Sequence, residues 1–272
     1  MRILVCNDDG IYSPGIAALA EVAAEFGTVR IVAPNAEQSS MGHAITANRP
    51  LSYRRTRIGE FEAYRVNGTP ADCVALGSHH WERVDIVLSG CNMGFNIGSG
   101  IWHSGTLSAA KQAVMLGLRG IAFSAPAGLD DFNVLKPSIR RVLEVLLPER
   151  ALPLVNVNLP REARGLLWTR VSVRHYDGII VPTKDPYGRE LYWFSVTPLE
   201  RAEEGTDRWA VEQHWISMTP VSLDLTDEVR LAECRARQPL DEPVAAVISP
   251  AESSKSEAKS VKQDEASAVE AQ

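Results

Sequence analysis

The sequence predicts an α/β fold: a doubly wound, mostly parallel sheet followed by an extension of antiparallel hairpins. Up to about residue 160, uninterrupted apolar runs of strand length alternate with helical segments, a pattern typical of a parallel sheet with helices on both faces. Beyond that point the apolar segments are short and alternating, with turn-rich polar sequence between them. Such segments favour antiparallel hairpins.

Three regions follow from this change of pattern. We expect an α/β core that carries the active site at residues 1–160, and a hairpin extension at residues 161–249 that completes the same domain. Projecting hairpins often build oligomers, because their edges are free to pair. Residues 250–272 contain no aromatic residue and consist largely of Ser, Lys, Glu and Ala. This composition predicts a disordered tail.

Composition restricts the class of protein. An apolar content of 45% with 23% charged residues is ordinary for a soluble globular protein. The net charge of −6 argues against a partner made of polymeric nucleic acid. The chain has no apolar run of bilayer-spanning length and no secretory signal. The four cysteines are scattered without a CxxC pair, so we expect a reduced, cytoplasmic protein without membrane partners.

The first predicted unit is strand–helix–strand. Apolar strands at Ile3–Cys6 and Val29–Ala33 enclose a helix that Ser13 caps, with Pro14 at its first position and Gly27 as its stop. The two strands should be parallel neighbours joined by a right-handed crossover. The glycines after the first strand do not form GxGxxG, which argues against a dinucleotide site.

A hairpin and a capped helix come next. Residues 51–57 and 61–66 alternate as two strands joined by a turn at residues 58–60. Thr69 and Asp72 then form a capping box for a helix that extends to about His80. Capping explains both residues, so we prefer it to a catalytic role.

A glycine-rich loop follows the next buried strand, residues 84–89. Residues 90–100 contain four glycines and two asparagines, and a helix begins within residues 102–106. Helix starts after glycine-rich loops are natural phosphate sites. The remaining predicted elements are strands at 121–125 and 154–159, a helix at 139–147, hairpin strands at 168–173, 191–196 and 215–218, and a short helix at 227–237.

Oxygen-bearing side chains follow the predicted parallel strands where each strand ends. Asp8 and Asp9 come directly after the first strand, Ser39 follows the second and Asn92 follows the strand at 84–89. Two adjacent carboxylates repel unless a cation joins them, and hard cations such as Mg²⁺ or Mn²⁺ prefer oxygen ligands. Alone, Asn-Asp-Asp-Gly is also good turn sequence, and Ser39 and Asn92 suit a loop and a turn. Their coincidence at strand ends favours a metal site.

Taken together, these motifs make the chain resemble the SurE survival proteins, which are metal-dependent nucleoside-monophosphate phosphatases. The resemblance runs through MRILVCNDDGIYSPGI, VAPNAEQSSMGHAIT, NGTPADCV, LSGCNMGFNIG, WHSGTLSAA and ISMTPVSLDLT, and covers nearly all of residues 1 to about 235. It implies a Rossmann-like core, a homodimer or homotetramer, and one divalent cation per subunit, Mg²⁺ or Mn²⁺. The implied metal ligands are Asp8, Asp9, Ser39 and Asn92.

The implied activity is release of phosphate from nucleoside 5′- and 3′-monophosphates, and in some members from short-chain polyphosphate. Two departures are visible: Lys111-Gln112-Ala113 replaces an acidic-then-glycine pattern, and the tail beyond Pro250 is extra. Neither touches a ligand position.

We expect Asp8, Asp9 and His103 to take part in catalysis. Either Asp8 or Asp9 could accept a proton from the attacking water, and His103 could protonate the departing ribose oxygen, although a histidine at this place could equally cap a helix. Substrate contacts are expected from Ser39, Asn96, Ser104, Gly105 and Thr106. An aspartyl-phosphate route is less favoured, because the chain lacks DxDx[TV].

Two other classes of function stay open at this point. One is a regulator that binds a nucleotide without hydrolysing it; the intact set of oxygen ligands weighs against it. The other is an interaction protein that uses its hairpin extension as a scaffold. Deleting residues 185–235 would then cause an assembly defect alone.

Overall fold

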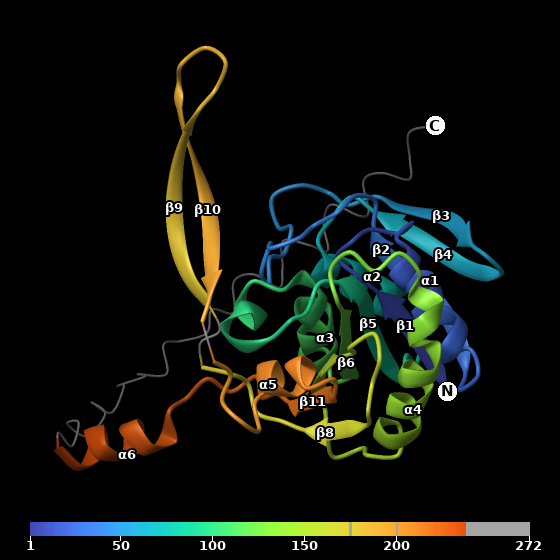
Figure 1. Ribbon diagram of the computed structural model, residues 1–272. Coiled ribbons are helices and arrows are strands. Elements are labelled where there is room, and N and C mark those ends of the chain that lie inside the picture. The colour runs from blue at the N-terminus through green and yellow to red at the C-terminus, as the bar shows by residue number, and fades with distance from the viewer. Residues whose placement is uncertain (174–175, 200, 238–272) are drawn as a thin grey trace, which may run out of the picture. The chain divides into compact units, whose positions relative to one another are not determined.

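The computed structural model describes residues 1–173, 176–199 and 201–237 (Figure 1). It divides into two compact units, Met1–Leu223 and Asp224–Gln272. The first carries the sheet and its helices. In the second, the described part contains helix α6 (Glu228–Arg237), close to the predicted bounds. The predicted tail at residues 250–272 lies outside the described residues.

The core of the first unit is a nine-stranded sheet in the order β3-β4-β2-β1-β5-β6-β7-β11-β8. From β4 to β7 all neighbouring strands are parallel, while β3 is antiparallel to β4 and β11 to β7. The predicted mostly parallel α/β sheet is therefore confirmed. Its strands are β1 (Arg2–Cys6), β2 (Thr28–Pro34), β3 (Tyr53–Ile58), β4 (Phe61–Val66), β5 (Ile86–Met93), β6 (Arg119–Ala125), β7 (Leu154–Asn158), β8 (Leu166–Trp168) and β11 (Ile216–Pro220).

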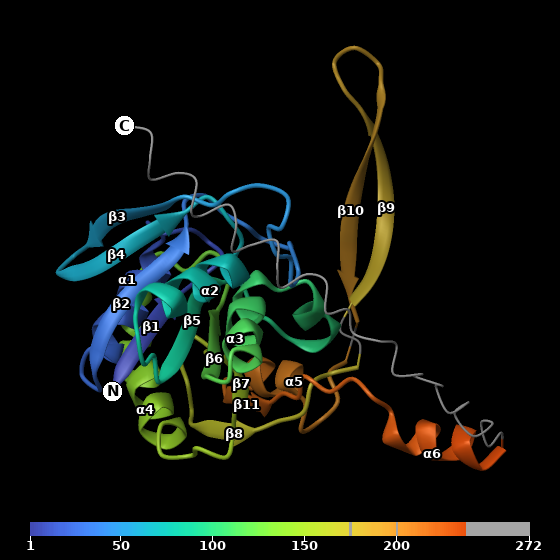
Figure 2. The same ribbon diagram turned by 180° about the vertical axis from the view of Figure 1, so that it is seen from behind.

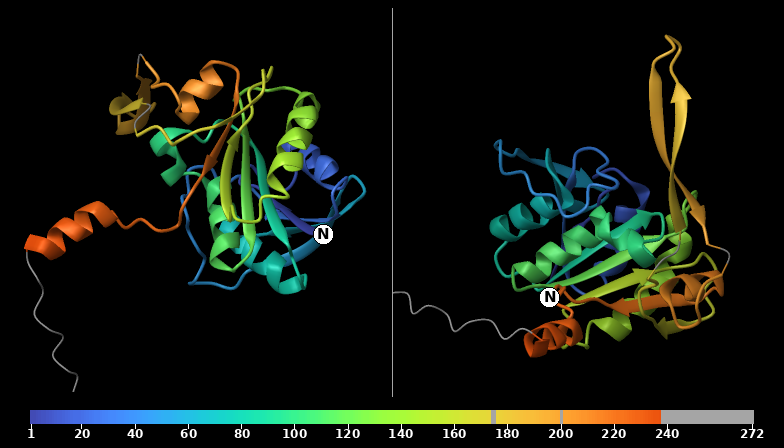
Figure 3. Two further views of the ribbon diagram at one scale, coloured as in Figure 1. Left: turned by 90° about the horizontal axis from the view of Figure 1, so that it is seen from below. Right: turned by 90° about the vertical axis from the view of Figure 1, so that its left-hand side faces the viewer.

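Helices cover both faces of this sheet. α1 (Pro14–Ala23) and α4 (Lys136–Leu146) lie on the face toward the viewer in Figure 1, and α2 (Pro70–His80) and α3 (Gly105–Met115) on the face toward the viewer in Figure 2. Figure 3 shows the sheet between these two helical layers. Two 3₁₀ helices, η1 (Gly98–Trp102) and η2 (Phe132–Leu135), lie in the connections.

The first strand shows why the sheet needs both layers. Ile3 and Val5 pack into the apolar cluster that contains residues of α1 and α4, whereas Leu4 and Cys6 pack into the cluster that contains residues of α2 and α3. Alternate side chains of a strand point to opposite faces, so a run that is apolar at every position must be buried on both sides.

The two predicted helix caps differ in outcome. The capping box at α2 is confirmed, since the Thr69 hydroxyl accepts from Asp72 N–H at 3.1 Å and the Asp72 carboxylate accepts from Thr69 N–H at 2.9 Å. Ser13 does precede Pro14 at the start of α1, but it makes no capping hydrogen bond. Its hydroxyl instead accepts from the Asn7 amide at 2.6 Å.

Gly27 does not end α1 as predicted, because the helix stops at Ala23. A Cβ on Gly27 would lie 2.2 Å from the Met1 carbonyl oxygen. That carbonyl accepts from Thr28 N–H at 2.9 Å. The lack of a side chain at Gly27 therefore allows the chain to pass close to Met1 where β2 begins.

The region after residue 160 differs from its sequence prediction. β8 and β11 join the main sheet, so the segment predicted at 215–218 is not part of a projecting hairpin. The strand predicted at 168–173 is also wrong, because the strand in this region is β8 at residues 166–168. In the described part of this region, β9 (Tyr176–Lys184) and β10 (Glu190–Pro198) form an antiparallel hairpin that pairs as a separate two-stranded sheet, which confirms the predicted hairpin extension. β10 contains the predicted strand at 191–196, while β9 and helix α5 (Asp207–Glu212) were not predicted. Among the described residues, no helix is long and apolar enough to cross a membrane.

Candidate active site

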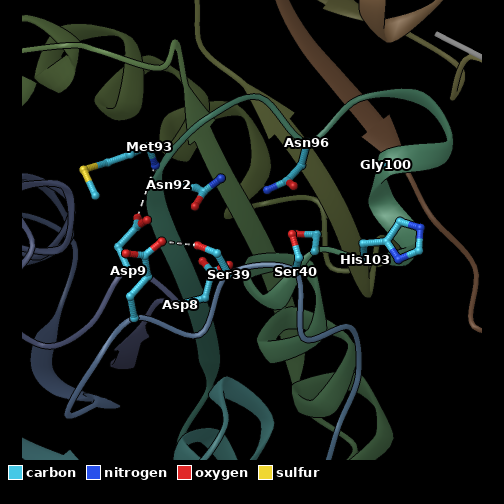
Figure 4. Close-up of a pocket in the computed structure, with 11 residues that line it drawn as sticks. Asp8, Asp9, Ser39, Ser40, Asn92, Met93, Asn96, Gly100 and His103 are labelled. Atoms are coloured by element: carbon cyan, nitrogen blue, oxygen red, sulfur yellow. Dashed lines mark hydrogen bonds between the residues drawn. The ribbon is translucent and has the colours of Figure 1, made fainter. Parts of the chain in front are cut away.

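The carboxyl ends of three neighbouring strands, β2, β1 and β5, open into a cavity of about 230 Å³ (Figure 4). In an open α/β sheet, ligands bind at this edge. The cavity, here called the acidic pocket, is lined by Asp8, Asp9, Glu37, Ser39, Ser40, Asn92, Met93, Asn96, Gly100, His103 and Ser104. All four of the predicted metal ligands therefore line one cavity, although they are up to 84 residues apart in the chain.

Asp8 is almost fully buried, with 4% of its surface exposed. Its carboxylate accepts a hydrogen bond of 2.6 Å from the Thr106 hydroxyl at the start of α3. Gly105 makes this approach possible, because a Cβ there would lie 2.7 Å from the Asp8 Cβ. Burial raises the pKa of Asp8, even though the hydrogen bond from Thr106 lowers it.

Asp9 is half-buried beside it, and its carboxylate accepts from Met93 N–H at 3.2 Å. Burial and then the neighbouring Asp8 charge raise the pKa of Asp9 to about 7. The lining also contains Glu37 but no lysine or arginine. No lysine or arginine among the described residues of the lining balances the charge of these carboxyl groups. Such a pocket favours binding of a metal cation.

Ser39 and Asn92 supply the neutral oxygens. The Ser39 hydroxyl donates to Glu37 at 2.7 Å, and the Asn92 amide N–H donates to the Gly94 carbonyl at 2.6 Å. The second contact turns the Asn92 amide so that its nitrogen is occupied and its oxygen remains available. Within the described ranges, no cluster of three or more His, Cys, Asp or Glu side chains could hold a metal. A cation here would therefore need the hydroxyl and amide oxygens beside the two carboxylates, and such a set fits Mg²⁺ or Mn²⁺.

Asn96 is held by a buried amide network rather than by the loop alone. Its backbone N–H donates to Asn158 Oδ1 at 2.9 Å, and its carbonyl accepts from Asn156 Nδ2 at 2.7 Å. Its side-chain amide donates to the Ser124 hydroxyl at 2.8 Å and to the Thr106 hydroxyl at 3.3 Å. β6 and β7 thereby fix the glycine-rich loop against Asp8 and its partner Thr106.

The predicted contacts near the start of α3 occupy different places. Ser104 caps α3 by accepting from Leu107 N–H at 3.0 Å and also lines the acidic pocket. Gly105 and Thr106 lie behind Asp8 and support it from the protein side. His103 lies at the end of the cavity away from Asp8 and Asp9 (Figure 4).

Sequence reasoning missed Glu37 and the two asparagines Asn156 and Asn158. Glu37 lies in the polar loop that carries Ser39 and gives no signal that separates it from other loop acids. The asparagines did carry a signal, since residues 154–158 read LVNVN. Asparagine inside a strand that is buried at every position must have a hydrogen-bond partner.

The chain is similar to known proteins over most of its length. Residues 3–178 match the family model described as survival protein SurE. The chain is 47% identical over 235 residues to 5′-nucleotidase SurE 1 of Thermus thermophilus, covering 83% of this chain and 93% of the relative. It is 44% identical over 238 residues to 5′-nucleotidase SurE of Deinococcus radiodurans, covering 83% and 88%. The crystal structure of the SurE protein from Aquifex aeolicus superposes with a TM-score of 0.76 at 37% identity, covering 87% of this chain and 99% of that one.

Proposed function

The chain belongs to the SurE survival protein family, and from this premise we propose that it is a 5′-nucleotidase, which hydrolyses nucleoside 5′-monophosphates to nucleoside and phosphate. The names of its relatives in Thermus and Deinococcus support the activity. The observation that carries the proposal is the acidic pocket, in which Asp8, Asp9 and Glu37 meet without a lysine or arginine. Nucleoside 3′-monophosphates and short-chain polyphosphate are further substrates that we propose for the same site.

We propose that one divalent cation, Mg²⁺ or Mn²⁺, is held by Asp8, Asp9, Ser39 and Asn92. The donor chemistry fits, because these side chains offer two carboxylates, a hydroxyl and an amide oxygen around one cavity. When bound, such an ion neutralises phosphate charge and lowers the pKa of a bound water.

Asp8 and Asp9 have different roles in this proposal. The Thr106 hydroxyl and Gly105 fix the position of Asp8, which makes Asp8 the rigid anchor of the site. Asp9 is more exposed, and the Met93 N–H is the one hydrogen-bond donor to its carboxylate among the residues that the structure describes. The Asp9 oxygen that is not bound elsewhere accepts the proton of the attacking water.

The phosphate is positioned by the loop and helix start across the cavity. Ser39 and Ser104 line the cavity and bring hydroxyl groups to the phosphate oxygens. Asn96, Gly105 and Thr106 act indirectly, because the Asn96 N–H groups are donated to Asn158, Ser124 and Thr106, and Gly105 and Thr106 lie behind Asp8. Preorganised donors of this kind stabilise charge that develops in the transition state. His103, at the far end of the cavity, donates a proton to the departing ribose oxygen.

For the assembly we propose a homodimer or homotetramer built through the β9–β10 hairpin. Its exposed apolar side chains include Ile180, Trp193 and Phe194, of which Phe194 is 69% exposed. A two-stranded ribbon with apolar side chains in water is marginally stable alone. We also propose that the protein is cytoplasmic, which agrees with the unpaired thiols of Cys6, Cys73, Cys91 and Cys234.

The test is phosphate release from a panel of nucleoside monophosphates with Mg²⁺, with Mn²⁺ and with EDTA. We expect metal-dependent release by the unaltered protein and none by Asp9→Asn. Asp130→Asn is the matched control, because Asp130 is exposed and away from the acidic pocket. No release with either metal would contradict the proposal and leave the regulator that binds nucleotide without hydrolysis.

A further inference from the structure

A second polar cavity lies at the same edge of the sheet, over β3 and β4. It has a volume of about 270 Å³ and is lined by Asn35, Ser52, Arg54, Arg65 and Asn67. This arginine pocket shares no residue with the acidic pocket and contains no carboxyl group. The segment after β2 separates the two cavities, since Asn35 lines one and Glu37 the other.

The two arginines of this pocket face each other across a strand pair. Arg54 of β3 is directly opposite Arg65 of β4 in the antiparallel register, so both side chains emerge on the same face. Opposed side chains of such a pair have Cβ atoms about 5 Å apart, and like charges at that spacing are destabilising. The net charge of −6 means that carboxylates outnumber basic side chains in this protein, yet no carboxylate lines the arginine pocket.

Neighbouring arginines, in contrast, form ion pairs with carboxylates. Arg30 lies 2.8 Å from Glu62, Arg55 lies 3.6 Å from the same carboxylate, and Arg57 lies 3.7 Å from Glu60. In the portion of the chain that the structure describes, Arg54 and Arg65 have no such ion pair. Each arginine that points elsewhere on this hairpin is balanced, and the pair that faces the cavity is not.

The neutral groups of the pocket also present donors. Asn67 Oδ1 accepts from Ser52 N–H at 2.7 Å, so the Asn67 amide nitrogen is the part left for the cavity. This contact also fixes the Asn67 side chain. The Asn67 carbonyl accepts from Arg49 at 2.5 Å, which ties a further cation to the rim. The cavity therefore combines two guanidinium groups with a fixed amide N–H₂.

We propose that the arginine pocket binds a tetrahedral phosphate oxyanion, either free inorganic phosphate or the phosphate group of a phosphomonoester. Paired guanidinium groups match phosphate oxygens in charge and in the geometry of their donors. A bound anion would remove the repulsion between Arg54 and Arg65. Both arginines are exposed, so binding is weak and depends on salt. This site is separate from the proposed catalytic centre and does not depend on the 5′-nucleotidase proposal.

The experiment is an NMR titration of the arginine Nε–H resonances with inorganic phosphate, in EDTA and at constant ionic strength. EDTA removes cations from the acidic pocket, whose carboxylates then repel phosphate. The signals of the two arginines are assigned from their loss in Arg54→Gln and Arg65→Gln. We expect both signals to shift and to saturate with one common dissociation constant.

Variants distinguish a specific phosphate site from nonspecific electrostatic attraction of phosphate to the protein. We expect Arg54→Gln/Arg65→Gln to weaken phosphate binding by about tenfold and each single change by about threefold. Arg55→Gln/Arg57→Gln is the matched control: it removes the same charge from the opposite face of the same hairpin. Linear shifts without saturation, or equal weakening by the control, would overturn the proposal.

A parallel titration with adenosine 5′-monophosphate in EDTA identifies the source of the phosphate. Tighter binding of the ester than of phosphate assigns the site to phosphomonoesters, and equal binding assigns it to the free anion. Because these titrations measure binding at Arg54 and Arg65 and not phosphate release, failure of either titration is distinct from failure of the 5′-nucleotidase proposal.

Discussion

The acidic pocket and the arginine pocket occupy the same edge of one sheet but have opposite charge. Asp8, Asp9 and Glu37 meet in the first, and Arg54 and Arg65 meet in the second. In both, like charges are placed together, and no described residue of opposite charge lines the cavity beside them, although the chain forms ion pairs elsewhere. Grouping like charges costs folding free energy. The comparison therefore indicates that each pocket is shaped for an ion of opposite sign.

The pockets differ in how firmly their charged groups are held. Asp8 is buried, fixed by Thr106 and backed by Gly105. Arg54 and Arg65 are exposed and have no hydrogen-bonded support among the described residues. Rigid, buried groups bind an ion with little loss of conformational entropy, as a catalytic site requires. Exposed, mobile side chains favour weak and reversible binding.

The largest effect should come from removing charge in the acidic pocket. Asp9→Asn should lower phosphate release by about 1,000-fold or more, because it removes the proposed metal ligand and the proposed proton acceptor together. Turnover measured with Mg²⁺ and Mn²⁺ checks this, with an unchanged circular dichroism spectrum as evidence of folding. Near-normal turnover would show that the metal assignment is wrong.

A smaller effect should come from loosening the support behind Asp8. Thr106→Val keeps the side-chain shape but removes the hydroxyl that donates to Asp8 at 2.6 Å. We expect turnover to fall by about 10- to 100-fold, as for groups that orient metal ligands. Thr106→Ser keeps the hydroxyl and should recover most of the activity. If Val and Ser variants are equally active, the hydrogen bond does not position Asp8.

The acidic pocket should also make metal-free stability depend on pH. The pKa of Asp9 is raised to about 7 in the folded protein, against an ordinary 3.8 in the unfolded chain. The folded state then holds the Asp9 proton more tightly than the unfolded chain does. The contribution of Asp9 to the free energy of unfolding is therefore fully present below about pH 4 and is lost as the pH rises from about 4 to 7. Asp9→Asn should reduce this dependence, and the raised pKa of Asp8 should leave part of it in place.

At pH 8 in EDTA, Asp9→Asn should therefore raise the free energy of unfolding by about 1 kcal/mol. The gain is small because the Asp9 side chain is partly exposed and water screens its charge. Urea unfolding at several pH values measures it. With Mg²⁺ present the order should reverse, because the ion stabilises only the unaltered site. A variant that is less stable than the unaltered protein in EDTA at pH 8 would contradict this account.

The smallest effect concerns the arginine pocket without its anion. Arg65→Gln relieves the repulsion with Arg54 and should raise the melting temperature by about 1–2 °C in phosphate-free buffer. Added phosphate should reduce or reverse this difference. Arg57→Gln is the control, since it breaks the pair with Glu60 and should give no gain. Thermal melts of the three proteins decide between these outcomes.

The sequence predicted elements that local chemistry determines. Thr69 and Asp72 form their predicted capping box because both partners lie within one helical turn. The apolar runs at β1 and β5 predicted buried parallel strands, since burial on both faces leaves no polar position. Asp8 and Asp9 were found by their place directly after such a run.

Other features depend on chain segments that meet only after folding. Leu166–Trp168 became the edge strand β8 because it pairs with β11, and nothing local distinguishes it from a hairpin strand.

By itself, the sequence determined the parallel α/β core, the capped start of α2 at Thr69 and the oxygen-bearing side chains that gather at the carboxyl edge of the sheet. Only the tertiary structure decided that Asn156 and Asn158 hold the loop of Asn96 and that Arg54 faces Arg65. The physical reason is the distance along the chain between the residues that interact. Helix caps and buried strands are set by neighbours a few residues away, whereas these contacts depend on strand register and on packing between distant segments.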